Sequence, residues 1–237
     1  MILLRRAEER HHDRRRKHDL WQTFHPRDRA DALCDGFGEL EVLNESQLRP
    51  GGAVPCQPPH DSEVITYVCE GALAYDVPRG SSRVVRAGEF QTKTLRRGMR
   101  HGGRNASTSD AARIFQVWLR LSESGVETSQ EQQRFSAADR RGALCVVASP
   151  DGRRGSLRIQ PHTVLHSALL ERGQHIVHAL APGRSAWLHL VGGEVALGDV
   201  VLGAGDGAGI SAYRAVSLTA RQRTEILLVD LAQPRSL

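Results

Sequence analysis

Side chains that can bind a metal ion, or act as acids, bases and nucleophiles, gather in two short segments of this chain. Residues 56–63 contain a cysteine, an amide, a histidine and two carboxylates, and residues 98–105 contain a further histidine. Imidazole and carboxylate groups are common ligands of transition metals. Whether these groups form one site depends on the elements that carry them.

The four cysteines are spread along the chain, at Cys34, Cys56, Cys69 and Cys145, and no two of them form a Cys-x-x-Cys pair. This spacing argues against a structural zinc site, and reduced thiols are the usual state in the cytosol. A redox-sensing thiol is the alternative hypothesis, with Cys56 as its candidate. Such a role depends on the pKa and exposure of the thiol.

The formal net charge is +5, and the densest basic stretch is Arg14-Arg15-Arg16-Lys17. Such a stretch can contact nucleic-acid phosphates, but acidic residues flank it and no helix-turn-helix, zinc-finger or aromatic RNA-binding signature accompanies it. We expect a solvated segment and no nucleic-acid partner. No apolar run reaches the roughly 18 residues that span a bilayer, and the apolar start is too short for a secretory signal. We therefore expect a cytoplasmic protein without membrane association.

Short strand-like runs dominate the sequence, and long amphipathic helical patterns are scarce. Several runs alternate apolar and polar residues, the period of a half-buried strand, and Gly, Pro, Asp and Ser clusters separate them. Clear examples are 64–68, 114–119, 144–147, 188–191 and 226–229. Many short strands separated by turns predict an all-β protein built as a sandwich or barrel.

A polar stretch at 122–141 divides the chain into halves of similar size and style, 1–121 and 142–237. Such a stretch is typical of a linker between domains. One weak internal echo supports a duplication. The segments 68–74 and 190–197 each contain a strand, a tight glycine turn and a return strand, at corresponding depths in the two halves.

Several motifs, in order, resemble the pirin family. They are Trp21-Gln22-Thr23-Phe24, Gly36 to Asn44, Pro58 to Gly71, Gly98 to Asn105 and Ser149 to Leu157. The resemblance covers nearly the whole chain. It implies an all-β bicupin, with two double-stranded β-helix (jelly-roll) barrels in tandem: an N-terminal cupin at 1–121, the linker at 122–141 and a C-terminal cupin at 142–237.

The resemblance also implies a metal site in the first barrel, where the family holds one ion, typically iron, by three histidines and a glutamate. Carried over to this chain, the two histidines of the first motif fall on Gln57 and Pro59. The third histidine falls on His101 and the glutamate on Gly103. Pro59 and Gly103 offer no side-chain donor. The resemblance therefore predicts a degenerate site without a cofactor.

Two neighbours of these positions are weak substitute ligands. His60 lies one residue out of phase with Pro59, so it would need a bulge to point inward. Glu63 is in phase with Pro59 if the strand is regular. Together with His101, these two residues are the candidates for a rearranged site for one iron, copper, nickel or manganese ion. The predicted ligand pocket is lined by Gln57, Pro59, His60, Glu63, His101 and Gly103.

The sequence leaves two classes of function open. The first, which we favour, is a non-catalytic protein that binds an unknown small molecule or protein partner as a sensor or regulator, because side-chain donors are lost at Pro59 and Gly103. The second is a metal-dependent quercetin 2,3-dioxygenase with a rearranged site. A transcriptional cofactor acting through protein contacts rests on family analogy alone. We expect a monomer, since the internal duplication can complete a bicupin within one chain.

Overall fold

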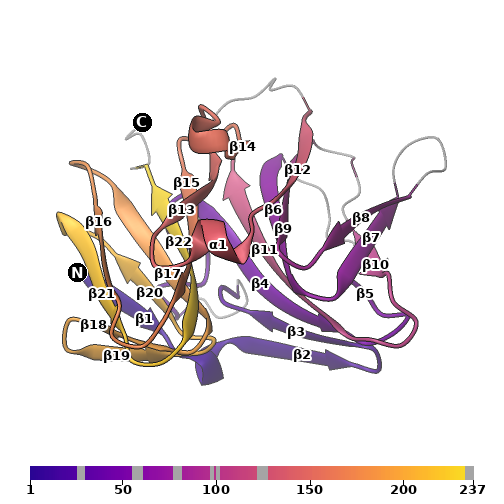
Figure 1. Cartoon of the computed structure of the whole chain (residues 1–237), viewed down its shortest axis with the longest axis horizontal. Coiled ribbons are helices and arrows are strands. Elements are labelled where there is room, and N and C mark those ends of the chain that lie inside the picture. Colours follow the sequence, from indigo (N-terminus) through magenta and orange to yellow (C-terminus); the bar gives the residue numbers. More distant parts are fainter. Residues whose placement is uncertain are drawn as a thin grey trace.

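The computed structural model describes residues 1–25, 30–54, 61–76, 82–96, 99, 102–121 and 128–232. These residues form two β-barrels that lie side by side, each made of a seven-stranded and a four-stranded sheet (Figure 1). In the described part of the chain, helical structure is limited to α1 (Ala137–Arg140) and two 3-10 turns, η1 (Ala7–Glu9) and η2 (Arg153–Gly155). The predicted all-β bicupin is confirmed.

The first barrel is built from the N-terminal half of the chain. Its larger sheet has the order β12 (Gln130–Arg134), β9 (Glu89–Leu95), β6 (Ser62–Glu70), β11 (Ala112–Arg120), β4 (Leu40–Leu48), β3 (His18–Gln22) and β2 (His11–Arg15). Its smaller sheet has the order β5 (Ala53–Val54), β10 (Gly103–Asn105), β7 (Ala72–Asp76) and β8 (Ser82–Arg86).

The second barrel repeats this plan. Its larger sheet has the order β1 (Ile2–Arg5), β20 (Gly207–Ile210), β17 (Ser185–Gly192), β22 (Thr224–Leu231), β15 (Val164–Leu170), β13 (Cys145–Ser149) and β14 (Leu157–Arg158). Its smaller sheet has the order β16 (His175–Ala179), β21 (Ala215–Ala220), β18 (Glu194–Leu197) and β19 (Val200–Gly203).

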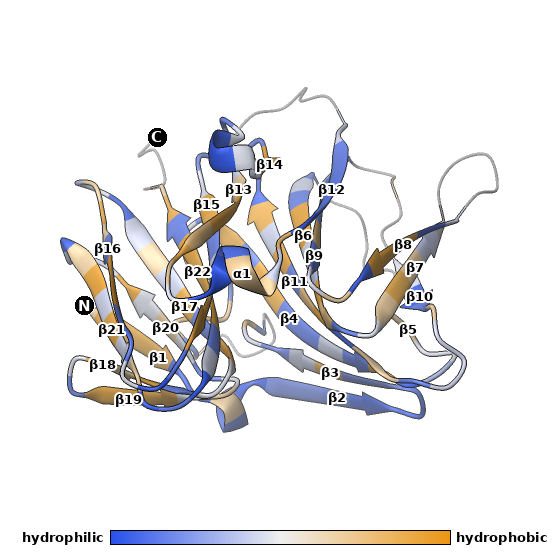
Figure 2. Cartoon of the chain, viewed as in Figure 1, coloured by the Kyte–Doolittle hydropathy of each residue, from blue (hydrophilic) through white to orange (hydrophobic). Residues whose placement is uncertain are grey.

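Alternation along the strands sends side chains to two different cores. On β6, Val64 and Val68 join the apolar interior of the first barrel, whereas Ile65 and Tyr67 join the core between the barrels. That shared core also takes Trp187 from the second barrel, and Figure 2 shows apolar residues on both sides of it. Each large apolar side chain removed from water in this way stabilises the fold by about 1.5–3 kcal/mol, so both barrels depend on their mutual contact.

The division of the chain at 122–141 stays a prediction, and the structure adds two strand pairings that the sequence did not indicate. Strand β1 pairs antiparallel with β20, from Ile2 opposite Ile210 to Arg5 opposite Gly207, so the N-terminus completes the second barrel. The expected linker is also structured where it is described, since β12 pairs with β9 of the first barrel and α1 follows it. Such pairings depend on tertiary contacts and leave no local signature in the sequence.

The internal echo corresponds to equivalent turns in the two barrels. Gly71 joins β6 to β7 with φ of 72°, and Gly193 joins β17 to β18 with φ of 83°. In both turns a β-carbon would clash with the backbone of the strand opposite. Separately, no helix in the described residues is both long and apolar enough to cross a membrane.

Candidate functional site

The predicted ligand pocket draws on the start of β6, in the larger sheet of the first barrel, and on β10, in its smaller sheet. Of its six residues, Glu63 and Gly103 are described by the structure. The other four, Gln57, Pro59, His60 and His101, lie outside the described residues, as does Cys56. The two described positions, and the layer of side chains next to them, show what this end of the barrel can hold.

Gly103 faces the interior of the first barrel, opposite Val54. A β-carbon built on Gly103 would lie 2.9 Å from Cγ of Leu73 and 3.1 Å from the carbonyl oxygen of Ala74. Leu73 is itself a buried member of the barrel interior. Gly103, the position onto which the resemblance carries the family's carboxylate ligand, therefore offers no side-chain donor, and Leu73 fills the space that a side chain would need.

Glu63 does not belong to the pocket, which corrects the prediction. It lies on the same face of β6 as Ile65 and Tyr67, which pack between the two barrels. Its Oε2 accepts a hydrogen bond from Oγ1 of Thr94 at 3.0 Å. The same Oε2 lies 3.5 Å from the backbone nitrogen of Gln160, in the second half of the chain. Glu63 thus joins the two halves rather than facing an ion in the first barrel.

The environment of Glu63 favours a protonated carboxyl group. The side chain is fully buried, and its Oε1 has no hydrogen-bond partner among the described residues. Burial raises the pKa of Glu63 to about 7, against hydrogen bonds from Thr94 and Gln160 that lower it. Removing a carboxylate from water disfavours its charged form, so a substantial fraction of Glu63 is protonated near neutral pH.

An apolar layer lies just inside the first barrel at this end. Val64, Leu95 and Trp118 are fully buried there, and Met99 and Val42 pack against them. Trp118 stands opposite Val64 across the β11–β6 ladder. This layer offers contact area for an apolar ligand but no charge with which to hold an ion.

The described cysteines do not have the properties of reactive thiols. Burial raises the pKa of the Cys69 thiol to about 12, and it also raises that of Cys145. Thiolates are the reactive form, so these two groups are poor nucleophiles at neutral pH. The hypothesis that Cys56 senses oxidants stays a prediction, because that residue lies outside the described part of the chain.

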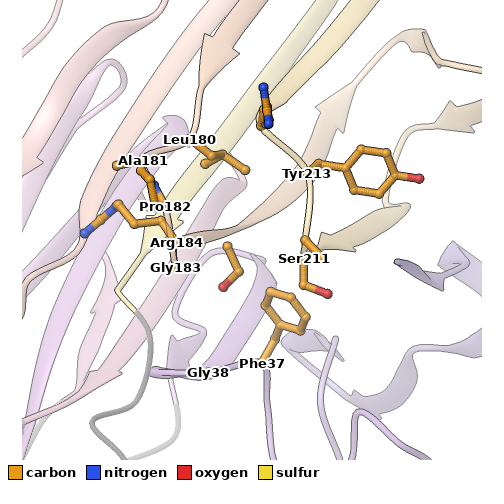
Figure 3. Close-up of a pocket in the computed structure, with 12 residues that line it drawn as sticks. Phe37, Gly38, Leu180, Ala181, Pro182, Gly183, Arg184, Ser211 and Tyr213 are labelled. Atoms are coloured by element: carbon orange, nitrogen blue, oxygen red, sulfur yellow. The ribbon is translucent and has the colours of Figure 1, made fainter.

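Sequence reasoning missed a cavity at one end of the second barrel. It has a volume of about 950 Å³ and lies between the β16–β17 loop, the β20–β21 loop and Phe37 with Gly38 of the first half. Figure 3 shows Phe37 and Leu180 on opposite sides of this cavity. Tyr213, 48% exposed, lies at its edge. The Pro182-Gly183 turn was its sole sequence signal, because the cavity brings together three distant segments.

Two antiparallel jelly-roll barrels with a shared core define this protein as a bicupin. The sequence profile of the family named Pirin matches residues 5–119, and that of the Quercetinase C-terminal cupin domain matches residues 146–231. The chain therefore belongs to the pirin family.

Known relatives match most or all of the chain. The chain is 34% identical over 231 residues to a quercetin 2,3-dioxygenase of Escherichia coli K12, covering 98% of this chain and 99% of that protein. It is 32% identical to a pirin-like protein of Caulobacter vibrioides, covering 83% of this chain and 84% of the relative. The crystal structure of YhhW from E. coli superposes with a TM-score of 0.91 at 33% identity and covers both chains completely. YhhW in complex with nickel(II) matches with a TM-score of 0.88 at 32% identity, over 99% of this chain and 100% of that one.

Proposed function

We propose that this pirin-family bicupin is a non-catalytic protein that binds a small molecule in its first barrel, as a sensor or regulator. The observation that carries the proposal is the packing of Leu73 against Gly103, because it fills the place of the family's carboxylate ligand. The apolar layer of Val64, Leu95 and Trp118 supports it further, since ligand pockets are mostly apolar with a few placed polar groups.

The residues that the structure describes do not fit the ion of the family. Gly103 supplies no donor, and Glu63 lies on the opposite face of β6. A stable transition-metal site needs three or four converging protein ligands. Pro59 cannot ligate through its side chain, so His101 and Gln57 supply only two of the three or four ligands that a stable site needs. A metal site would therefore also need His60, reached by a local rearrangement of the chain.

A metal-dependent quercetin 2,3-dioxygenase is the second candidate function. The name of the E. coli K12 relative and the nickel(II) complex of YhhW favour it. It requires one iron, copper, nickel or manganese ion held by a site rearranged around His60 and His101. The two functions differ in a property that is simple to measure, the consumption of dioxygen.

Oxygen uptake on quercetin separates the two candidates. We predict that the protein, supplied in turn with each of the four metals, consumes no more dioxygen with quercetin than the free metal ion does. The E. coli K12 relative assayed in parallel is the positive control. Uptake well above the free-ion rate, lost in His101→Ala, would establish the dioxygenase instead.

Restoring the missing ligands tests whether their loss, and the packing of Leu73, prevent metal binding. The triple variant Gln57→His, Pro59→His and Gly103→Glu, together with His101, gives the four ligand side chains of the family. Leu73→Ala in addition makes room for the new glutamate. We predict stoichiometric nickel only in the variant that includes Leu73→Ala. Equal metal content with and without this change would contradict the role given to Leu73.

Location and assembly are further proposals. The described cysteines Cys34, Cys69 and Cys145 are all unpaired, which supports a cytoplasmic location. The pairing of β1 with β20 lets the chain's own N-terminus complete the second barrel, which supports a monomer. Light scattering at micromolar concentration is expected to give the mass of one chain, and a dimer mass would contradict this.

A further inference from the structure

One end of the second barrel holds a cluster of polar and charged side chains that the proposed function does not use. Arg184 precedes β17, His178 lies on β16, and Asp230 lies on β22. On these strands the in-phase neighbours Ile176 and Leu228 belong to the interior core of the second barrel. Because side chains two apart on a strand share a face, His178 and Asp230 point toward the barrel interior, and Arg184 reaches Asp230 from the loop before β17.

Asp230 holds the other two side chains in place. His178 Nε2 lies 2.7 Å from its Oδ2, and Arg184 Nε donates to its Oδ1 at 2.5 Å. Arg184 Nη2 donates to the carbonyl oxygens of Asp230 at 2.8 Å and of His162 at 3.0 Å. Burial alone would raise the pKa of Asp230, but these hydrogen bonds hold it below its ordinary value. Asp230 is therefore ionised, and both of its carboxylate oxygens are used.

The equivalent layer of the first barrel is apolar. There Trp118 stands opposite Val64 in the ladder, whereas in the second barrel Asp230 stands opposite Ala186. Burying a charge is costly unless the charge is paired, as Asp230 is here with Arg184. Because the equivalent layer of the first barrel is apolar, the fold itself does not require this polar cluster, and we infer that it has a function. His166 adds to the cluster: this imidazole is buried, packs edge-on against His178, and its Nδ1 has no partner among the described residues.

A cavity of about 430 Å³ adjoins the cluster, on a wall shared with the β16–β17 loop. Arg153 and Asp151 border it from the turn after β13, and Pro150, Val164 and Ala179 give it apolar sides. The Asp151 carboxylate accepts a hydrogen bond from Ser149 Oγ at 2.8 Å. It accepts a second one from the backbone nitrogen of Arg153, in the same turn, at 3.3 Å.

The hydrogen-bond balance of this cavity favours an anion. Both carboxylates at its edge are engaged within the protein. The hydrogen bonds that Arg153 donates in the described residues come from its backbone nitrogen, and those that the Arg184 side chain donates come from Nε and Nη2. The Arg153 guanidinium, whose charge adds to the Ser149 hydrogen bond in lowering the pKa of Asp151, and Nη1 of Arg184 therefore keep hydrogen-bond donors for a ligand. Guanidinium groups bind carboxylates through charge-assisted, often bidentate hydrogen bonds. The volume is in the lower part of the range for small-molecule sites.

We propose that this cavity of the second barrel binds a small organic carboxylate with a compact apolar body. The carboxylate lies between Arg153 and Arg184, with His178 beside it, and the carbon skeleton rests on Val164 and Ala179. The site is independent of the first barrel and of any metal.

Benzoate is a suitable probe, with benzamide as its neutral isostere. In amide-resolved NMR titrations of the full chain, we expect benzoate to shift the resonances of Arg153, Val164 and His178, and benzamide to leave them unchanged. Arg153→Ala, an exposed side chain, is expected to weaken benzoate binding roughly tenfold. Arg172→Ala, an equally exposed arginine in the turn after β15, is the matched control and is expected to have no effect.

Three results would overturn the proposal. One is binding of benzamide as strong as that of benzoate, because the guanidinium pair would then have no role. Another is an equal loss of affinity in Arg153→Ala and Arg172→Ala, which would indicate general charge attraction. The third is the absence of shifts in the second barrel at millimolar benzoate. Shifts confined to the first barrel would likewise refute this site while supporting the proposed function.

Discussion

Glu63 is a carboxyl group buried between the two barrels, and its ionisation links stability to pH. Its pKa is raised to about 7 by burial, above the ordinary value of 4.5 that it regains on unfolding. The folded protein therefore binds this proton more tightly than the unfolded chain does. The stabilisation is complete below about pH 4.5 and is lost as the pH rises through 7.

Glu63→Gln removes this titration and keeps the hydrogen-bonding shape of the side chain. We predict that the variant gains stability over the wild type between pH 5 and pH 8, by up to about 3 kcal/mol in the free energy of unfolding. Urea denaturation at the two pH values measures it. Glu70→Gln, exposed at the other end of β6, is the control. A difference between Glu63→Gln and wild type that does not change with pH would contradict the shifted pKa.

The position of Glu63 also shows where strand phase misleads. The sequence placed it in the pocket by assuming a regular strand back to Pro59. Strand β6 begins at Ser62, and Glu63 stands opposite Leu119 and Thr94 on the face with Ile65. A period-two pattern is reliable only within the paired strand, because a one-residue irregularity reverses every side chain before it. Gly103, by contrast, faces inward as the pocket prediction required.

At the scale of elements, the equivalent turns at Gly71 and Gly193 are the part of the duplication that the sequence could predict. Each requires a positive φ and a close approach to the neighbouring strand, and glycine satisfies both. Strand existence was also predictable from alternation. The partners of β1 and β12 were not, because pairing across most of the chain length depends on tertiary contacts.

The two requirements of the Gly193 turn can be separated by substitution. In Gly193→Ala the new methyl would clash with the Arg223 carbonyl and lie 2.6 Å from Cα of Thr224. Gly173 has nearly the same φ, 85°, but nothing within 4 Å of a new methyl. We predict a cost of about 1 kcal/mol for Gly173→Ala, from backbone strain alone. Gly193→Ala is expected to cost at least about 2 kcal/mol more, and equal costs by thermal denaturation would contradict the close approach.

At the scale of the whole molecule, a buried polar network joins the barrels beside their shared core. Arg140, from α1, donates through Nη1 to Glu225 Oε1 at 2.7 Å and to the Tyr67 hydroxyl at 3.0 Å. It also lies 3.2 Å from Ser167 Oγ. Arg140 is only 6% exposed, so its charge depends on these partners. The two barrels are therefore expected to unfold together.

Arg140→Met tests this coupling. Removing one partner of a buried ion pair leaves Glu225 uncompensated, and we predict a loss of about 3–5 kcal/mol. Calorimetry is expected to show one transition for the wild type and a lower transition temperature for the variant. Arg221→Ala removes an exposed pair with Glu194 and is expected to cost less than about 1 kcal/mol. Two resolved transitions in the wild type would show that the barrels unfold separately, and would contradict their coupling through the shared core.

The central claim, that the first barrel is built to bind without an ion, is tested most directly by calorimetric titration with nickel(II), the metal bound by YhhW. We predict no stoichiometric high-affinity binding, and only weak heat that His101→Ala leaves unchanged. One equivalent of tightly bound nickel that disappears in His101→Ala would contradict the account and would support a rearranged metal centre.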